Sequence, residues 1–160
     1  MLNTVTSKCT VIGNIQDGSG IENMSGIDKY KQRILATLKP NDQAIMPRSI
    51  EGDIKELHKL YNYLGLNGTY IKQKNIFFIG SGGKLSESIL EEMKKPKSGV
   101  KEFIEQSPYI IPFINSSNIC KISGLTKGGH TNRTSKSSEI INNKSTAQSE
   151  LRKLGVSTPE

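Results

Sequence analysis

The sequence predicts a small α+β domain in which about five helices pack on a small mixed sheet of short strands and hairpins. Two patterns support this fold class: apolar residues recur with a helical period in several segments, and short runs of β-formers separate them. No internal repeat is visible in the 160 residues, and this length suits one domain. We expect a globular core over residues 1–123, a flexible basic Gly/Ser/Thr/Lys loop or linker over 124–137, and an amphipathic C-terminal helix over 138–156.

Helices are expected where apolar residues are spaced three or four positions apart. The most regular stripe lies in residues 49–64, with Ser49 as a cap, and Gly65 follows where a left-handed residue can end the helix. The other predicted helices are residues 25–38, 85–93, 98–104 and 138–156.

Strands are expected in short runs of β-branched and aromatic residues that turn residues separate. The predicted strands are residues 9–12, 69–71, 76–79, 109–114 and 119–123. The second pairs with the third, and the fourth with the fifth, as two hairpins joined by short turns. Pro112 lacks an amide hydrogen, which places the strand over residues 109–114 at an edge of the sheet.

Composition excludes several classes of protein. With 34% hydrophobic residues the chain can form a core, and its longest apolar runs are far shorter than a membrane span. No apolar segment follows Met1, so we expect no classical secretory signal and a protein that is cytosolic or delivered to a target-cell cytosol by a non-classical route. Cys9 and Cys120 match no metal spacing, and reduced thiols are favoured over a disulfide. The abundance of Ile, Asn, Lys and Ser without Trp suggests a bacterial or phage source.

The positive charge is unevenly distributed. The formal net charge is +7, and no acidic residue occurs between Glu105 and Glu139. Basic groups in such a stretch act together because no nearby carboxylate neutralises them. The segment is therefore either a contact surface for phosphate groups or a solvated loop that aids solubility.

A glycine-rich loop between a predicted strand and a predicted helix is the first candidate site. Gly80, Ser81, Gly82, Gly83 and Lys84 are its expected anion-binding residues, because glycines let the backbone approach a phosphate and helix amides donate to it. The loop resembles the phosphate-binding loop of nucleotide-binding βα units. Phe78 stands where the Walker pattern requires Gly, and Leu85 where it requires Ser or Thr, which disfavours a magnesium-dependent NTPase. The alternative is a connection that merely begins a helix.

The second candidate site lies in the basic segment. His130, Arg133 and Lys136 are its candidate catalytic residues. Metal-independent ribonucleases use such groups: histidine moves the 2′-hydroxyl proton, and Arg or Lys stabilises the charged phosphorane. His58 is the only other histidine and falls beside an apolar helix stripe. The alternative is a polar surface loop without catalysis.

These observations favour a small basic effector or toxin-type domain that acts on RNA or another phosphate-bearing target. If it is an enzyme, the expected reaction is metal-independent phosphodiester transesterification. The alternative is a non-catalytic protein- or phospholigand-binding module of a secreted effector or assembly protein. Expected partners are RNA, a phosphorylated ligand, or a protein such as a host target or cognate inhibitor. No metal, cofactor or membrane span is expected.

Overall fold

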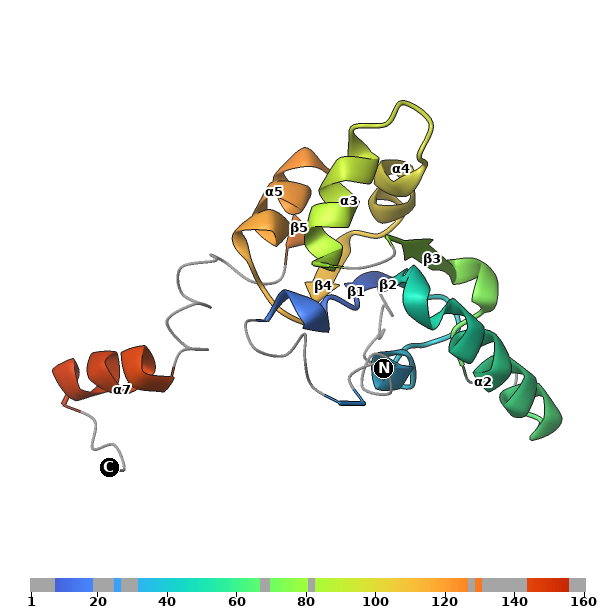
Figure 1. Ribbon diagram of the computed structural model, residues 1–160, viewed down its shortest axis with the longest axis horizontal. Coiled ribbons are helices and arrows are strands. Elements are labelled where there is room, and N and C mark those ends of the chain that lie inside the picture. The colour runs from blue at the N-terminus through green and yellow to red at the C-terminus, as the bar shows by residue number, and fades with distance from the viewer. Residues whose placement is uncertain are drawn as a thin grey trace, which may run out of the picture.

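The structure is a computed structural model that describes residues 8–18, 25–26, 32–66, 70–80, 83–126, 129–130 and 144–155. Its strands are β1 (Cys9–Ile12), β2 (Gln43–Pro47), β3 (Ile76–Ile79), β4 (Tyr109–Pro112) and β5 (Gly129–His130). Its helices are α2 (Glu51–Tyr63), α3 (Leu85–Met93), α4 (Val100–Glu105), α5 (Ser117–Leu125) and α7 (Lys144–Lys153), with a further helical turn at residues 32–35. Helices packed on a small sheet are what the sequence predicts (Figure 1).

Parallel pairing joins all five of these strands, in the order β3-β2-β1-β4-β5. The predicted hairpins are therefore wrong. Their two turns, at residues 72–74 and 115–118, lead instead into β3 and into a helix, so each strand finds partners far away in the sequence. Parallel neighbours need a crossover connection, and helices supply it here.

The strand β2 was not predicted, although it lies between β1 and β3 and is entirely buried. Its residues include Gln, Ala, Met and Pro, which do not favour strands strongly. A buried hydrogen-bond network accounts for the polar residue at its start: the side-chain oxygen Oε1 of Gln43 accepts from Ser107 Oγ at 2.7 Å and from Thr10 Oγ1 at 3.2 Å. Tertiary contacts thus override weak local preference.

The predicted strand at residues 119–123 is helical and belongs to α5. Ser116 caps this helix by accepting from the Ile119 amide, and Ile119 and Ile122 are buried at helical spacing. Part of the segment predicted as a linker, residues 124–137, has regular structure: Gly124 and Leu125 end α5, and β5 occupies Gly129–His130. The rest of that segment beyond residue 126 lies outside the described residues. The strand predicted over residues 69–71 is also wrong where the structure describes it, because residues 70–71 do not belong to the sheet.

Pro112 ends β4, which is not an edge strand because β1 and β5 flank it. The ladder with β5 involves only Tyr109 and Ile110. Pro112 pairs with Ile12 of β1 but lies beyond the last pair of the β5 ladder, so its missing amide hydrogen costs no bond to β5.

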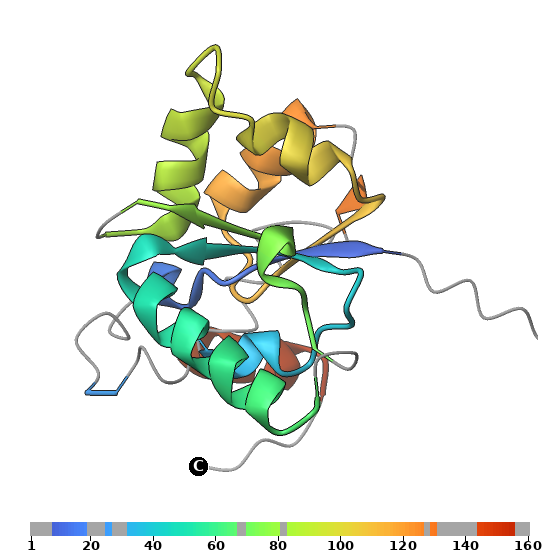
Figure 2. The ribbon, with the colours of Figure 1, turned by 90° about the vertical axis from the view of Figure 1, so that its right-hand side faces the viewer.

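Helices cover both faces of the sheet, as Figure 2 shows with α3, α4 and α5 on one side and α2 on the other. Side chains alternate between the faces along each strand, so that Val11 joins one core and Ile12 the other. The core under α2 includes Leu35, Met46, Ile50, Ile54 and Ile71, and the core under α3–α5 includes Ile45, Leu85, Ile89, Ile104, Ile110 and Ile119.

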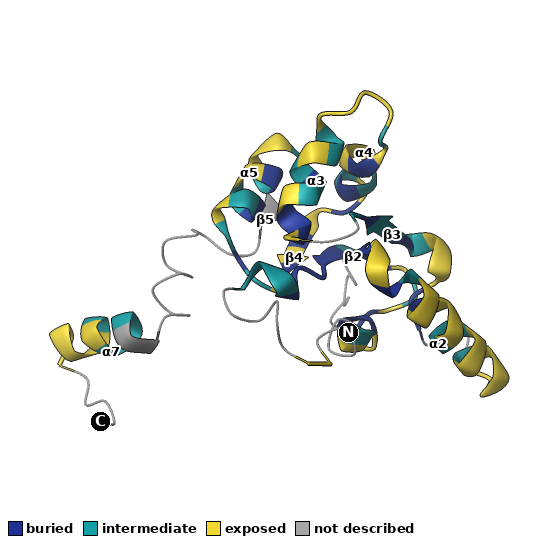
Figure 3. Cartoon of the chain, in the orientation of Figure 1, coloured by how far each residue is buried: buried dark blue, intermediate teal, exposed yellow. Residues whose placement is uncertain are grey.

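The helix predicted over residues 49–64 is confirmed as α2, in which Ile54 is buried in the core while Leu57 and Tyr61 pack against the same core partly buried (Figure 3). Ile54 is fully buried, whereas Leu60 is 51% exposed. Gly65 has φ +71°, and the Leu66 amide donates to the Tyr61 carbonyl at 2.9 Å, as predicted for this helix end. Ser49 is not the cap, since it lies in a short 3-10 turn before the helix.

The C-terminal helix is confirmed over Lys144–Lys153, and Gly155 has the left-handed φ of +76° that ends such helices. Figure 1 shows α7 apart from the sheet. The earlier part of the predicted range, residues 138–143, lies outside the described residues. None of the helices in the described ranges is long and apolar enough to cross a membrane.

Candidate functional site

The carboxyl edge of the sheet, where all five strands end, is the first place to seek a ligand site. In open parallel sheets ligands bind outside the carboxyl ends of the strands, at the point where the strand order reverses. Here β1 is the starting strand, and the chain extends from it to β2 and β3 on one side and to β4 and β5 on the other. The reversal therefore lies between β1 and β4.

At this reversal point the Asn14 side chain connects the loops that follow β1 and β4. Its Oδ1 accepts from the amides of Phe113 and Ile114 at 3.0 and 3.1 Å, and its Nδ2 donates to the Ile114 carbonyl at 2.7 Å. Asn14 is completely buried. The crevice between the two loops is therefore filled by the protein itself.

The predicted anion-binding loop follows β3 and leads into α3, which confirms the strand–loop–helix arrangement. Ser81 and Gly82 lie outside the described residues, whereas Gly83 and Lys84 are exposed. Gly80 has φ +66°, and a Cβ there would lie 2.7 Å from Ser88 Oγ. The fold alone thus requires glycine at position 80, whether or not a ligand binds.

An acidic side chain lies at the amino end of α3. Asp17 Oδ1 is 3.4 Å from the Ser86 amide nitrogen, and Asp17 Oδ2 accepts from Asn14 Nδ2 at 2.9 Å. This carboxylate takes a position that would otherwise attract an external anion. An anion near the loop therefore has to overcome repulsion from Asp17.

Arg48 supplies positive charge at the same edge of the sheet. It was not among the candidate residues predicted from the sequence. It follows β2 directly, and its Nη2 donates to the Phe78 carbonyl at 3.1 Å, two residues before Gly80. Its side chain remains 63% exposed. Its ion-pair contact with Glu51 is long, 3.9 Å, and Glu51 accepts a closer contact of 2.8 Å from Lys55, which lowers the pKa of Glu51. Recognising β2 in the sequence would have placed Arg48 at a strand end.

The predicted catalytic residues are described only in part. His130 belongs to β5 and pairs with Ile110, two residues before the end of β4. Because β5 runs parallel to β4, the chain leaves His130 toward the carboxyl edge. Arg133 and Lys136 lie outside the described residues.

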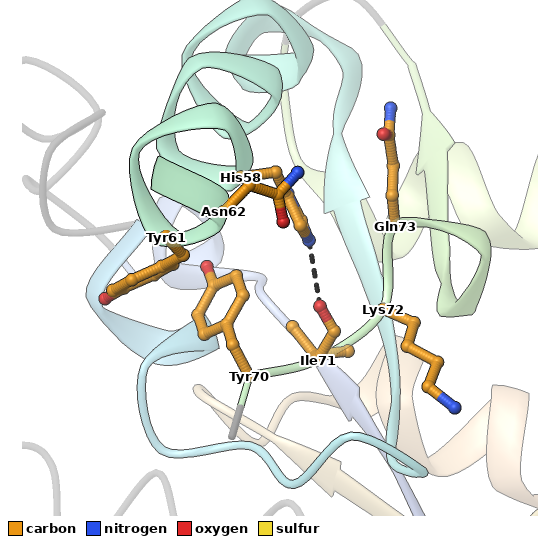
Figure 4. Close-up of a pocket in the computed structure, with 7 residues that line it drawn as sticks. All are labelled: His58, Tyr61, Asn62, Tyr70, Ile71, Lys72 and Gln73. Atoms are coloured by element: carbon orange, nitrogen blue, oxygen red, sulfur yellow. Dashed lines mark hydrogen bonds between the residues drawn. The ribbon is translucent and has the colours of Figure 1, made fainter. Parts of the chain in front are cut away.

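His58 is bonded into the fold. Its Nδ1 is 2.9 Å from the Ile54 carbonyl oxygen and its Nε2 is 2.8 Å from the Ile71 carbonyl oxygen. Carbonyl oxygens only accept, so both contacts are complete hydrogen bonds when the imidazole carries two protons. Both ring nitrogens thus face backbone carbonyl oxygens, and His58 joins α2 to the segment before β3 (Figure 4).

No three His, Cys, Asp or Glu side chains gather as a metal site within the described ranges. Comparison of the chain with protein-family models, curated proteins and solved structures finds no match.

Proposed function

We propose that the chain is a binding module for RNA, whose phosphate groups it holds at the carboxyl edge of the sheet between Arg48 and the amino end of α3. The observation that carries this proposal is the position of the Arg48 guanidinium beside the last residues of β3, next to the loop that ends at Lys84.

The chemistry of these groups suits phosphate. A guanidinium presents several donors in one plane and retains its charge, which matches phosphate oxygens. Lys84 is exposed and precedes the first turn of α3, so its ammonium adds charge where the helix amides begin. We infer that Arg48, beside the end of β3, and Lys84, before the first turn of α3, act together on the same phosphate chain.

Two features favour a polyanion over a single phosphate group. The charge of Asp17 weakens the attraction for one phosphate bound at α3, so affinity has to come from several contacts. The net charge of +7 and the acid-free segment, which includes α5 and β5, provide more cations along the chain.

A salt series with a short single-stranded RNA tests the proposal. Each lost phosphate contact should reduce the slope of log affinity against log salt by about 0.7. We expect this for Arg48→Gln and for Lys84→Gln, measured by fluorescence anisotropy. Lys97→Gln is the matched control, because it removes the same charge from the exposed α3–α4 connection. Equal slopes for all three variants would refute binding at this edge.

The same RNA samples test catalysis by His130. If His130 transfers the 2′-hydroxyl proton, cleavage products should end in 2′,3′-cyclic phosphate, and His130→Ala should slow cleavage by roughly 10²–10⁴-fold. If the RNA stays intact at high protein excess, the chain has no ribonuclease activity and the proposal is limited to RNA binding.

A further inference from the structure

The side of β4 that faces away from α3–α5 carries exposed apolar residues. Tyr109 and Ile111 are 45% and 40% exposed, and Phe113, directly after the strand, is 51% exposed. The residues between them, Ile110 and Pro112, are buried, and Ile110 belongs to the core under α3–α5. Side chains alternate between the two faces of a strand, so Tyr109 and Ile111 lie on the side of the sheet that carries α2.

The neighbouring strand β1 shows where the cover of this face ends. Ile111 pairs in register with Val11 of β1, so the two side chains lie next to each other on the same face. Val11 is buried in the core under α2, whereas Ile111 beside it is open. The described helices on this side, α2 and the turn at residues 32–35, belong to the connections among β1, β2 and β3. Neither of them leads to or from β4, and parallel sheets are normally covered on both faces.

The helix α7 has an apolar stripe that matches this face. Ala147, Leu151 and Leu154 are four and then three positions apart, so they lie on one side of the helix. The Leu154 amide donates to the Glu150 carbonyl at 3.2 Å, which continues the helix to this residue. The stripe is about 10 Å long, and Tyr109 to Phe113 span about 13 Å.

This apolar stripe is exposed where the structure places α7. Leu151 is 41% exposed and Leu154 78%. Figures 1 and 2 place α7 on the side of the sheet that carries α2, but away from the strands. A helix of ten residues is marginal in water without tertiary contacts. The helix α7 therefore needs an apolar surface to pack on.

The connection to α7 is long enough to reach β4. The chain leaves β5, which pairs with β4, at His130, and α7 begins at Lys144. The chain between these two residues can span at most about 45 Å. A connection of this length holds α7 near its own sheet at a concentration on the order of millimolar. Docking within one chain is therefore favoured over docking on a second copy at micromolar concentration.

We propose that the exposed face of β4 is a docking site for the amphipathic helix α7 of the same chain, with Leu151 and Leu154 packed against Tyr109 and Ile111. Docking places α7 beside the layer that contains α2, so that helices cover both faces of β4. The face is thus a surface that fits an apolar helix stripe. This inference is independent of RNA binding, and its test contains no RNA.

Hydrogen exchange of the full chain tests the docking from the side of α7. The α7 amides should exchange at least about tenfold more slowly in the unmodified chain than in Leu151→Asp, because the introduced charge would enter the apolar contact. Ser149→Asp is the matched control, since residue 149 is exposed and lies on the opposite side of the helix. Its α7 amides should remain as protected as in the unmodified chain.

The same measurement tests the docking from the side of the sheet. Ile111→Asp should release α7 as Leu151→Asp does, while the amides of α3, on the other face, keep their protection and show that the fold is intact. Tyr109→Asp is a second variant of the same face. Leu60→Asp places the same charge in the groove of about 610 Å³ between α2 and residues 32–36, the other apolar surface on this side, and should leave α7 protected.

Three outcomes would overturn the proposal. Unprotected α7 amides in the unmodified chain would show that the helix stays free in solution. Release of α7 by Leu60→Asp, and not by Ile111→Asp or Tyr109→Asp, would assign the helix to the groove on α2. Protection that rises with protein concentration, together with a dimer in analytical ultracentrifugation, would assign the face of β4 to a second copy of the chain.

Discussion

The carboxylate of Asp17 lies at the amino end of α3, with Oδ1 3.4 Å from the amide nitrogen of Ser86. The two residues are 69 positions apart in the sequence. The contact satisfies one amide in the first turn of α3, and it places a negative charge at the amino end of this helix. The negative charge of Asp17 at this helix end is the reason why the proposed function relies on Arg48 as well as on the glycine-rich loop.

Replacement of Asp17 by Asn should strengthen RNA binding. The amide oxygen of Asn can still accept from Ser86 and the repelling charge is lost, although the NH2 group of Asn cannot replace the oxygen that accepts from Asn14 Nδ2. A charge at a helix end contributes about 0.3–1 kcal/mol, so affinity at low salt should rise about two- to fivefold. Anisotropy titration measures this rise. Glu102→Gln removes the same charge from the exposed side of α4 and should have a smaller effect. Equal gains in both variants would mean that only net charge matters.

Replacement of Ile54 should show that its side chain is a core element of α2, in contrast to that of Leu60. Ile54 is completely buried, so Ile54→Ala should lower the free energy of unfolding by about 2–5 kcal/mol. Leu60 lies six residues later in the same helix and is 51% exposed, so Leu60→Ala should cost below about 1 kcal/mol. Urea unfolding of the two variants measures both values. Similar losses would show that the second half of the helix is buried in solution.

Local patterns were enough to predict the helices that became α2, α3 and α4. Each has an apolar period and a recognisable end, such as Gly65 or Pro96, and these signals lie within a few residues. The strands β1 and β3 also stand out, because β-branched and aromatic residues dominate them. In each case the residues that determine the element are neighbours in the sequence.

The pairing of the strands could not be predicted in this way. Parallel neighbours such as β1 and β4 are about one hundred residues apart, and nothing near either strand indicates its partner. The same applies to the candidate site. Arg48 became a candidate through its contact with Phe78 on β3, and the Asp17–Ser86 contact likewise depends on the folded arrangement.

Stability should fall between about pH 9 and pH 11 partly because of Cys9. Burial, with a smaller contribution from Asp42, raises the pKa of the Cys9 thiol from 9.0 to about 11. Above pH 9 the unfolded chain therefore loses the thiol proton while the folded chain keeps it, which favours unfolding. Denaturant unfolding at several pH values should show a steeper decline for the unmodified chain than for Cys9→Ala. Parallel declines would show that Cys9 is accessible to water.

Replacement of Asn14 by Ala should destabilise the fold at the point where the strand order reverses. The amide and carbonyl of Ile114 would lose their bonds to this buried side chain, whereas the Phe113 amide would keep its bond to the Ile12 carbonyl. An unsatisfied buried polar group costs about 1–3 kcal/mol, so the free energy of unfolding should fall by at least about 2 kcal/mol. Asn41→Ala, at an exposed turn, is the matched control and should change stability little. A small loss in Asn14→Ala would mean that water enters between the β1 and β4 loops and replaces the amide, which would leave that crevice open to a ligand.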